Sequence, residues 1–163
     1  MYPSIFDVDT YAQRDFNQML NRGAGHRLMN MVRRKPNQLL DFEAVRETLN
    51  LGNQYDAGIQ IVSIEDIVGS VGRTHDFDDE FYPLSDDSRD RWCSVAAAFY
   101  AEKVLPPVEL YKIDEQYFVI DGNHRISVFK AVGQIFIEAH VIEIEALEER
   151  CQTQEVPSLR YER

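Results

Sequence analysis

The stretch YFVIDGNHRISVFKAVG, residues 117–133, constrains the fold most because two kinds of secondary structure meet in it at one sharp bend. Its apolar start predicts a strand, and apolar residues at helical spacing follow almost at once. The dipeptide Asp121-Gly122 between them permits a tight turn, since glycine adopts positive φ without steric cost. We therefore predict a strand, a bend, and a helix that begins near Asn123 and ends before Gly133.

Further strands and helices are predicted around this junction. Residues 108–113 and 116–120 predict the two strands of a hairpin, and the alternation over 135–141 predicts a final strand. We interpret the succession of strand, short helix and strand as a right-handed crossover on a small sheet. Upstream, residues 59–64 predict a strand, and a helix with Trp92 in its core face follows the irregular stretch 69–84.

The N-terminal region has the pattern of short amphipathic helices. Thr10 is positioned to cap a first helix, which Gly23 and Gly25 are expected to interrupt. A second short helix is expected to end before Pro36, and Asp41 is positioned to cap a third. Such short helices are not stable alone, so we expect them to pack on the rest of the chain.

These elements predict an α+β fold, a small mixed β-sheet with flanking helices, preceded by an N-terminal helical extension. We assign residues 1–56 to the extension, 57–147 to the core domain and 148–163 to a C-terminal tail. The sequence shows neither a run of ~20 apolar residues nor the pattern of a signal peptide. We therefore expect a cytoplasmic protein without a membrane partner, whose two cysteines, Cys93 and Cys151, are unpaired thiols.

The charge of the chain is both high and uneven. The net charge is −11, yet residues 1–60 hold seven acidic and seven basic side chains, so the excess of carboxylates lies in the remainder. The electrostatic field of the whole chain therefore disfavours binding to the DNA backbone. A local basic cluster in the neutral part has two interpretations, the solvated face of a helix pair or a contact with nucleic acid or acidic lipid. Its members are Arg22, His26, Arg27, Arg33, Arg34 and Lys35.

The bend before the helix has the features of an anion site. A helix N-terminus presents unpaired backbone N–H groups and a partial positive charge. His124 and Arg125 place positive charge at the helix end that favours carboxylates, which is electrostatically unfavourable. A bound phosphate would offset this unfavourable interaction. Ser127 can add a hydroxyl. In the alternative interpretation Asp121 pairs with Arg125, and His124 bonds a neighbouring carbonyl.

Residues 106–145, PPVELYKIDEQYFVIDGNHRISVFKAVGQIFIEAHVIEIE, resemble the core of the ParB/sulfiredoxin superfamily, in which a strand, a turn of the D-G-x-H-R or G-E-R-R type, a helix and a strand follow one another. The resemblance extends to IQIVSIEDIVGSVGR at residues 59–73, which is similar to the first box of ParB N-terminal domains. It implies a site for a nucleoside triphosphate, ATP or CTP. The phosphates would lie at residues 121–125, with Arg73 opposite and Ser70 nearby.

Departures from the family narrow the implied activity. Sulfiredoxins carry a nucleophilic cysteine where this chain has Asn123, so sulfinic-acid repair has no nucleophile here. Chromosome-partitioning ParB proteins continue into a helix-turn-helix domain that residues 146–163 do not resemble, so we do not expect sequence-specific operator binding. The superfamily also includes a free serine kinase, and Glu109 or a carboxylate of residues 76–80 is a candidate general base by that resemblance.

The loop RTHDFDDEF, residues 73–81, carries a group of acidic side chains. Asp76 and Asp78 are candidate ligands of Mg²⁺ beside a nucleotide, because hard cations prefer oxygen ligands. A solvated acidic loop is the alternative. His75 is a candidate base or phosphate contact.

Three hypotheses of function follow from this sequence: one is DNA binding through the basic cluster of residues 22–35, and the other two concern the nucleotide pocket. Of these two, the first is a nucleotide-dependent switch or regulator, with a DNA or protein partner and with homodimerisation left open. The second is a small-molecule phosphotransferase, or a ParB-like nuclease or nucleotide hydrolase, that uses the same pocket.

Overall fold

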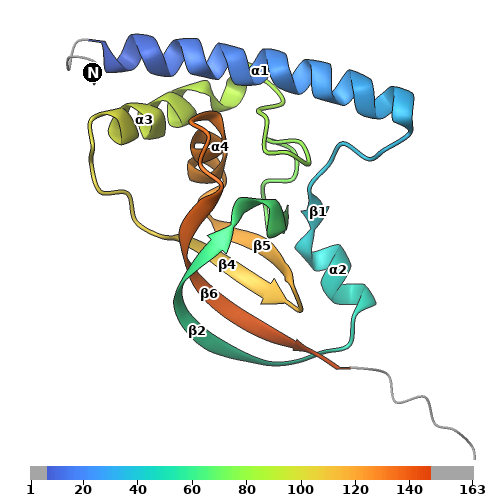
Figure 1. Ribbon diagram of the computed structural model, residues 1–163. Helices are drawn as coiled ribbons and strands as arrows, with labels where there is room; N and C mark the ends of the chain where they lie inside the picture. Colours follow the sequence, from blue (N-terminus) through green and yellow to red (C-terminus); the bar gives the residue numbers. More distant parts are fainter. Residues whose placement is uncertain (1–6, 148–163) are drawn as a thin grey trace, which may run out of the picture.

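The computed structural model describes residues 7–147 and confirms an α+β fold with a six-stranded mixed sheet and flanking helices (Figure 1). Helix α1 (Val8–Arg33) runs across one end of the molecule above α3 (Arg89–Tyr100) and α4 (Asn123–Ala131), while α2 (Phe42–Thr48) lies at the side of the sheet. None of the helices among these residues has the length and hydropathy needed to cross a membrane.

The sheet combines parallel and antiparallel pairs. In spatial order its strands are β1 (Leu40–Asp41), β3 (Ile67–Ser70), β5 (Gln116–Asp121), β4 (Val108–Ile113), β6 (Phe136–Ala146) and β2 (Leu51–Ser63). The predicted hairpin is confirmed as the antiparallel pair β4–β5. Because β4 is antiparallel to β5 and parallel to β6, strands β5 and β6 run in opposite directions. The predicted right-handed crossover is therefore wrong, and α4 joins two antiparallel strands that have β4 between them.

Helix α1 is one continuous element, so the predicted interruption at Gly23 and Gly25 is wrong. It begins at Val8 with Asp7 as N-cap, not at a Thr10 cap. Gly23 lies on the buried face of α1, where a β-carbon would come within 2.6 Å of Tyr82 Cβ. This glycine therefore allows the helix to approach the 71–88 loop and does not break it.

The region assigned to the N-terminal extension also contains strands. β1 pairs with β3, and β2 begins at Leu51, within residues 1–56. Asp41 caps α2 as predicted, because its carboxylate accepts the backbone N–H of Glu43 at 3.2 Å. Of the two cysteines, Cys93 is a buried free thiol, whereas Cys151 and the predicted tail, 148–163, lie outside the described residues.

The sheet buries apolar side chains on both faces. The larger core lies between the sheet and α1, α3 and α4, with Phe16, Trp92 and Ile126 fully buried. A smaller core on α2 joins Phe42 to Phe118. Trp92 is thus a core residue, as predicted, and its indole donates a hydrogen bond to Ser127 Oγ at 2.9 Å.

Candidate anion-binding site

The bend between β5 and α4 requires glycine at residue 122. Gly122 has φ +117°, and a β-carbon there would lie 2.5 Å from Val108 Cγ1 on the neighbouring strand β4. Both the backbone conformation and the close approach therefore exclude a side chain. The amides at the start of α4 are consequently placed beside the strand ends.

A small cavity of about 90 Å³ opens at this helix N-terminus. Basic side chains reach it from three segments: the loop after β3, helix α3 and helix α4. Its lining residues are Arg73, Arg91, Val95, Ile120, Asp121, Gly122, Asn123, His124 and Arg125. The structure therefore brings together six of the eight predicted nucleotide-binding residues, leaving out Ser70 and Ser127.

Asn123 contributes to this cavity a buried polar atom without a hydrogen-bond partner. It is only 5% exposed, and its Oδ1 is buried without a hydrogen-bond partner. A buried polar group without a partner costs about 1–3 kcal/mol. Because Oδ1 is an acceptor, a ligand would complete its bonding with an N–H or O–H donor rather than with a phosphate oxygen.

His124 is neutral at neutral pH. Burial, the largest cause, and charge repulsion from the nearby Arg91 and Arg73 together lower the pKa of its imidazole to about 4. The ring also meets Phe77 edge to face, with centroids 5.1 Å apart. A neutral imidazole donates one N–H, so His124 offers a bond to an anion without adding a charge.

Arg125 makes contacts that correspond to the alternative interpretation of the motif. One Nη donates to the carbonyls of Pro106 and Pro107 at 2.6 and 2.7 Å, and the other pairs with Asp121. Its guanidinium therefore braces the loop before β4 while forming part of the cavity wall. Arg73 and Arg91 are the more accessible cations.

The two serines predicted for the site do not line it. Ser127 is fully buried; its hydroxyl donates to Phe81 O at 2.7 Å and accepts from Trp92. Ser127 lies in the interior, where it joins α3, α4 and the 71–88 loop. Ser70 is also fully buried, and its Oγ donates to Val119 O at 3.3 Å.

A second cavity of about 210 Å³ adjoins the first. The two share Arg73, Arg91 and His124 as lining residues. The remaining lining residues of the second cavity are Asp76, Ser85, Asp87 and Ser88. Asp76 accepts a hydrogen bond from Arg73 at 2.8 Å, so one predicted metal ligand lies beside the anion pocket.

Asp78, the other predicted metal ligand, is directed elsewhere. Its carboxylate is fully buried, accepts the N–H groups of Glu80 and Tyr82, and pairs with Arg27 of α1 at 3.2 Å. Within residues 7–147 it belongs to a carboxylate and imidazole group formed with His26 and Asp79, which does not include Asp76. Asp78 therefore does not fit a shared Mg²⁺ site with Asp76.

The two predicted catalytic residues are exposed and outside both cavities. His75 lies on the surface of the loop. Glu109 pairs across the sheet with Asp121 of β5 and His140 of β6, so its side chain is near the bend but not in the pocket.

Sequence reasoning missed Arg91, which lines both cavities. It lies in α3 directly before the buried Trp92 and is one of several charged residues in the range 86–91, which gave no reason to single it out. One signal was present: Arg91 and Val95 are four residues apart, so they share a helical stripe beside the Trp92 face. Only the packing of α3 on α4 shows that this stripe meets the bend.

Comparisons with known proteins give one partial likeness. No family model and no curated protein matches the sequence. Among solved structures, sulfiredoxin from Arabidopsis thaliana is similar with a TM-score of 0.41 and 16% identity, over 53% of this chain and 86% of that chain.

Proposed function

We propose that this chain binds a nucleoside triphosphate, ATP or CTP, by its phosphates in the cavity at the N-terminus of α4. The bound nucleotide acts as a conformational switch for a protein or nucleic-acid partner. The resemblance of residues 59–145 to the ParB/sulfiredoxin superfamily supports the choice of ligand.

The observation that carries the proposal is the convergence of donors on one small cavity. Arg73 and Arg91 face it together with the neutral ring of His124, which can donate one N–H. The N-terminus of α4 adds backbone N–H groups and a partial positive charge. Such an array suits a phosphate group, because each oxygen accepts several charge-assisted hydrogen bonds.

Mg²⁺ would accompany the nucleotide. Asp76 and Asp87 are the carboxylates that line the adjoining cavity, next to Arg73 and Arg91. Mg²⁺ typically takes one or two carboxylates together with phosphate oxygens and water. We therefore assign Asp76, and not Asp78, to the metal.

Calorimetric titration of the four nucleoside triphosphates, with and without Mg²⁺, tests the proposal. Arg91→Gln is expected to weaken binding roughly tenfold or more, because it removes a charge-assisted hydrogen bond. Asn123→Asp keeps the shape of the side chain but adds a negative charge, so it is expected to weaken binding at least as much. Arg46→Gln is the matched control, since Arg46 is exposed on α2 and pairs with Glu43.

The proposal fails if no triphosphate binds at millimolar concentration, or if Arg91→Gln and Arg46→Gln have equal affinities. Recovery of intact labelled nucleotide after hours of incubation distinguishes a switch from the phosphotransferase or hydrolase alternative, for which the label would be converted.

A further inference from the structure

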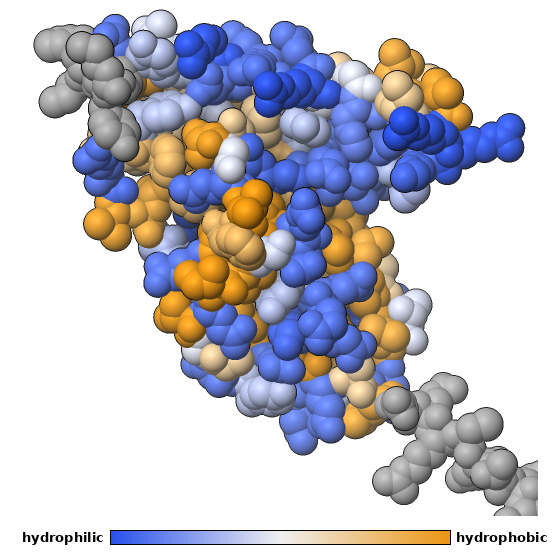
Figure 2. All heavy atoms as spheres, in the orientation of Figure 1, coloured by the Kyte–Doolittle hydropathy of each residue, from blue (hydrophilic) through white to orange (hydrophobic). Residues whose placement is uncertain are grey.

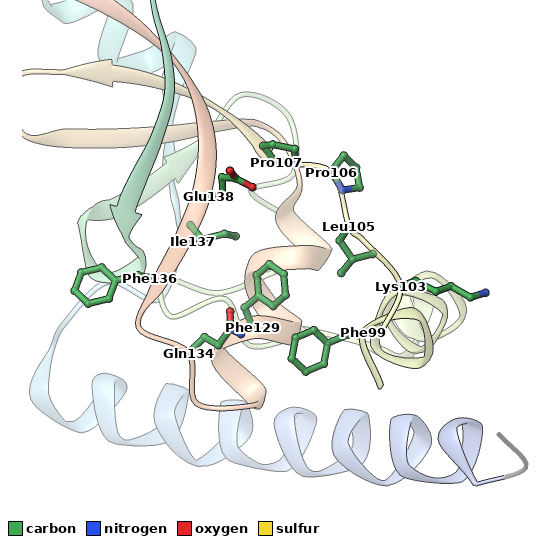
Figure 3. Close-up of a pocket in the computed structure, with 10 residues that line it drawn as sticks. All are labelled: Phe99, Lys103, Leu105, Pro106, Pro107, Phe129, Gln134, Phe136, Ile137 and Glu138. Carbon is green, nitrogen blue, oxygen red and sulfur yellow. The ribbon is translucent and has the colours of Figure 1, made fainter. Parts of the chain in front are cut away.

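A separate apolar pocket lies at the opposite end of α4 (Figure 3). Its volume is about 260 Å³. The view shows Phe99, Leu105, Phe129 and Ile137 arranged around one space, with Pro106 and Pro107 along one side. These side chains come from α3, the loop before β4, α4 and β6. Phe99 and Phe129 pack edge to face, with centroids 5.6 Å apart.

Arg125, which lines the anion site, also fixes one wall of the apolar pocket. The hydrogen bonds from Arg125 to Pro106 O and Pro107 O fix the chain segment whose rings form that wall. The pocket is therefore preformed, and a ligand need not order the loop. This contact gives the buried guanidinium a positioning role at both ends of α4.

Exposed apolar side chains occur next to the lining residues of the pocket along the chain. Val104 is 97% exposed, Ile135 63% and Phe136 55%, and each is adjacent in sequence to a lining residue or is one itself. Ile61 of β2, also exposed, is paired with Glu138 across the sheet. Figure 2 shows orange side chains over the end of β2 and the start of β6, and another group on the loop after α3. The apolar surface is thus wider than the pocket itself, which is typical of a protein contact.

The charges around the pocket favour a basic occupant. Glu138 lines the pocket, with its carboxylate toward the same space, and makes no ion pair with any residue in the range 7–147. The ammonium group of Lys103 is turned away from the space in Figure 3. The whole chain carries a net charge of −11. An incoming segment with cations would therefore be attracted and would find a partner for Glu138.

We propose that this pocket and its apolar rim form the docking site for a basic segment of a partner protein, with one aromatic side chain inserted between Phe129 and Leu105 and a neighbouring Lys or Arg paired with Glu138. This docking site does not require bound nucleotide, so it is independent of the proposed function. Two other occupants are less well matched. A second copy of the chain would bring another strongly acidic surface, and the pocket is smaller than the about 300–1,000 Å³ usual for a small-molecule site.

Titration of the ¹⁵N-labelled full chain with capped peptides tests the proposal by NMR. The probe is Lys-Lys-Phe-Lys-Lys, and the matched controls are Lys-Lys-Ala-Lys-Lys and Glu-Glu-Phe-Glu-Glu. We expect the probe to shift the amides of Leu105, Phe129 and Ile137. Loss of the phenyl ring should weaken binding about tenfold, as for a central anchor residue. The acidic peptide should not bind.

Two variants of exposed residues sharpen the test. Glu138→Gln is expected to weaken binding of the basic probe roughly two- to fivefold, the range for a partly exposed ion pair. Arg46→Gln, in which the lost charge lies on α2 and outside the pocket lining, is expected to leave the affinity unchanged. Both substitutions lie on the surface, and a spectrum with unchanged dispersion verifies the fold of each variant.

Several results would overturn the proposal. Equal shifts from the basic and acidic peptides would remove the role of charge. Shifts confined to other surfaces, or no shift at millimolar peptide, would leave the pocket without this ligand. A dimer in sedimentation analysis that dissociates on Phe136→Lys would assign the surface to a second copy of the chain.

Discussion

Helix α4 has a polar cavity at its first turn and an apolar pocket at its last turns, and the two sites were unequally visible in the sequence. The polar cavity is built largely from consecutive residues, 120–125, whose order already describes a bend and a helix start. The apolar pocket takes its side chains from four segments between residues 99 and 138, none of which carries a recognisable motif. A contiguous site can be found by its motif, whereas a dispersed one requires the fold.

The two ends of α4 are linked by Arg125, and its removal is expected to have the largest effect. Arg125→Ala would leave Pro106 O and Pro107 O without their donor and Asp121 without its cation. We expect a loss of about 3 kcal/mol in the free energy of unfolding, as for a buried charged group with several hydrogen bonds. Chemical denaturation measures it, with Arg46→Ala as a control expected to change less than about 0.5 kcal/mol.

The contrary result for Arg125→Ala would be informative. If nucleotide binding were lost while the free energy of unfolding stayed constant, Arg125 would act as a phosphate ligand, as the motif predicts. The link between the two ends of α4 would then be absent.

A pH titration separates the two ends, because only the polar end contains a buried histidine. The pKa of His124 is about 4 in the folded protein, below the ordinary value of 6.5, so the unfolded chain binds a proton that the folded chain rejects. This contribution to stability is complete above pH 6.5 and is lost as the pH falls toward 4. It amounts to at most about 3 kcal/mol.

The measurement compares denaturation of the wild type and His124→Gln at pH 7 and pH 4.5. The carboxylates titrate in both proteins, so their effect cancels in the comparison. The wild type is expected to lose more stability than the variant, because only the wild type has an imidazole that binds a proton on unfolding. Parallel pH profiles would show that the imidazole is accessible to protons in the folded state.

A glycine pair in α1 tests the support of the loop that carries Arg73. Gly23→Ala is expected to destabilise the protein by about 1–3 kcal/mol, since its new methyl group would overlap Tyr82. Gly25→Ala has open space and is expected to stabilise it by about 0.5–1 kcal/mol through helix propensity. Thermal unfolding of the two variants should therefore show shifts of opposite sign. Shifts of the same sign would show that α1 does not contact the loop closely.

The elements with local signals were predicted well. The β4–β5 hairpin, the start of α4 near Asn123 and the Asp41 cap each depend on residues close in sequence. The errors came from long-range packing. A glycine that interrupts an isolated helix is retained in α1 because Tyr82 needs its space, and the antiparallel course of β5 and β6 depends on β4 lying between them.

The same distinction applies within the candidate site. Asp76 and Asp78 looked alike in the sequence, yet one lines the cavity next to Arg73 and the other is bonded into its own loop and to α1. Ser127 looked like a phosphate donor but is bonded in the interior to Phe81. The residue types suggested these roles. The direction of each side chain, which depends on the tertiary structure, determines whether the residue lines the cavity.

Trp92 is the single tryptophan of the chain, and its indole N–H is bonded to Ser127 on α4, five residues past the Gly122 bend. Selective excitation of tryptophan fluorescence therefore reports on the contact between α3 and α4, without a signal from any other tryptophan. The emission wavelength of Trp92 depends on this contact, so ligand binding at either end of α4 can be followed without attaching a dye.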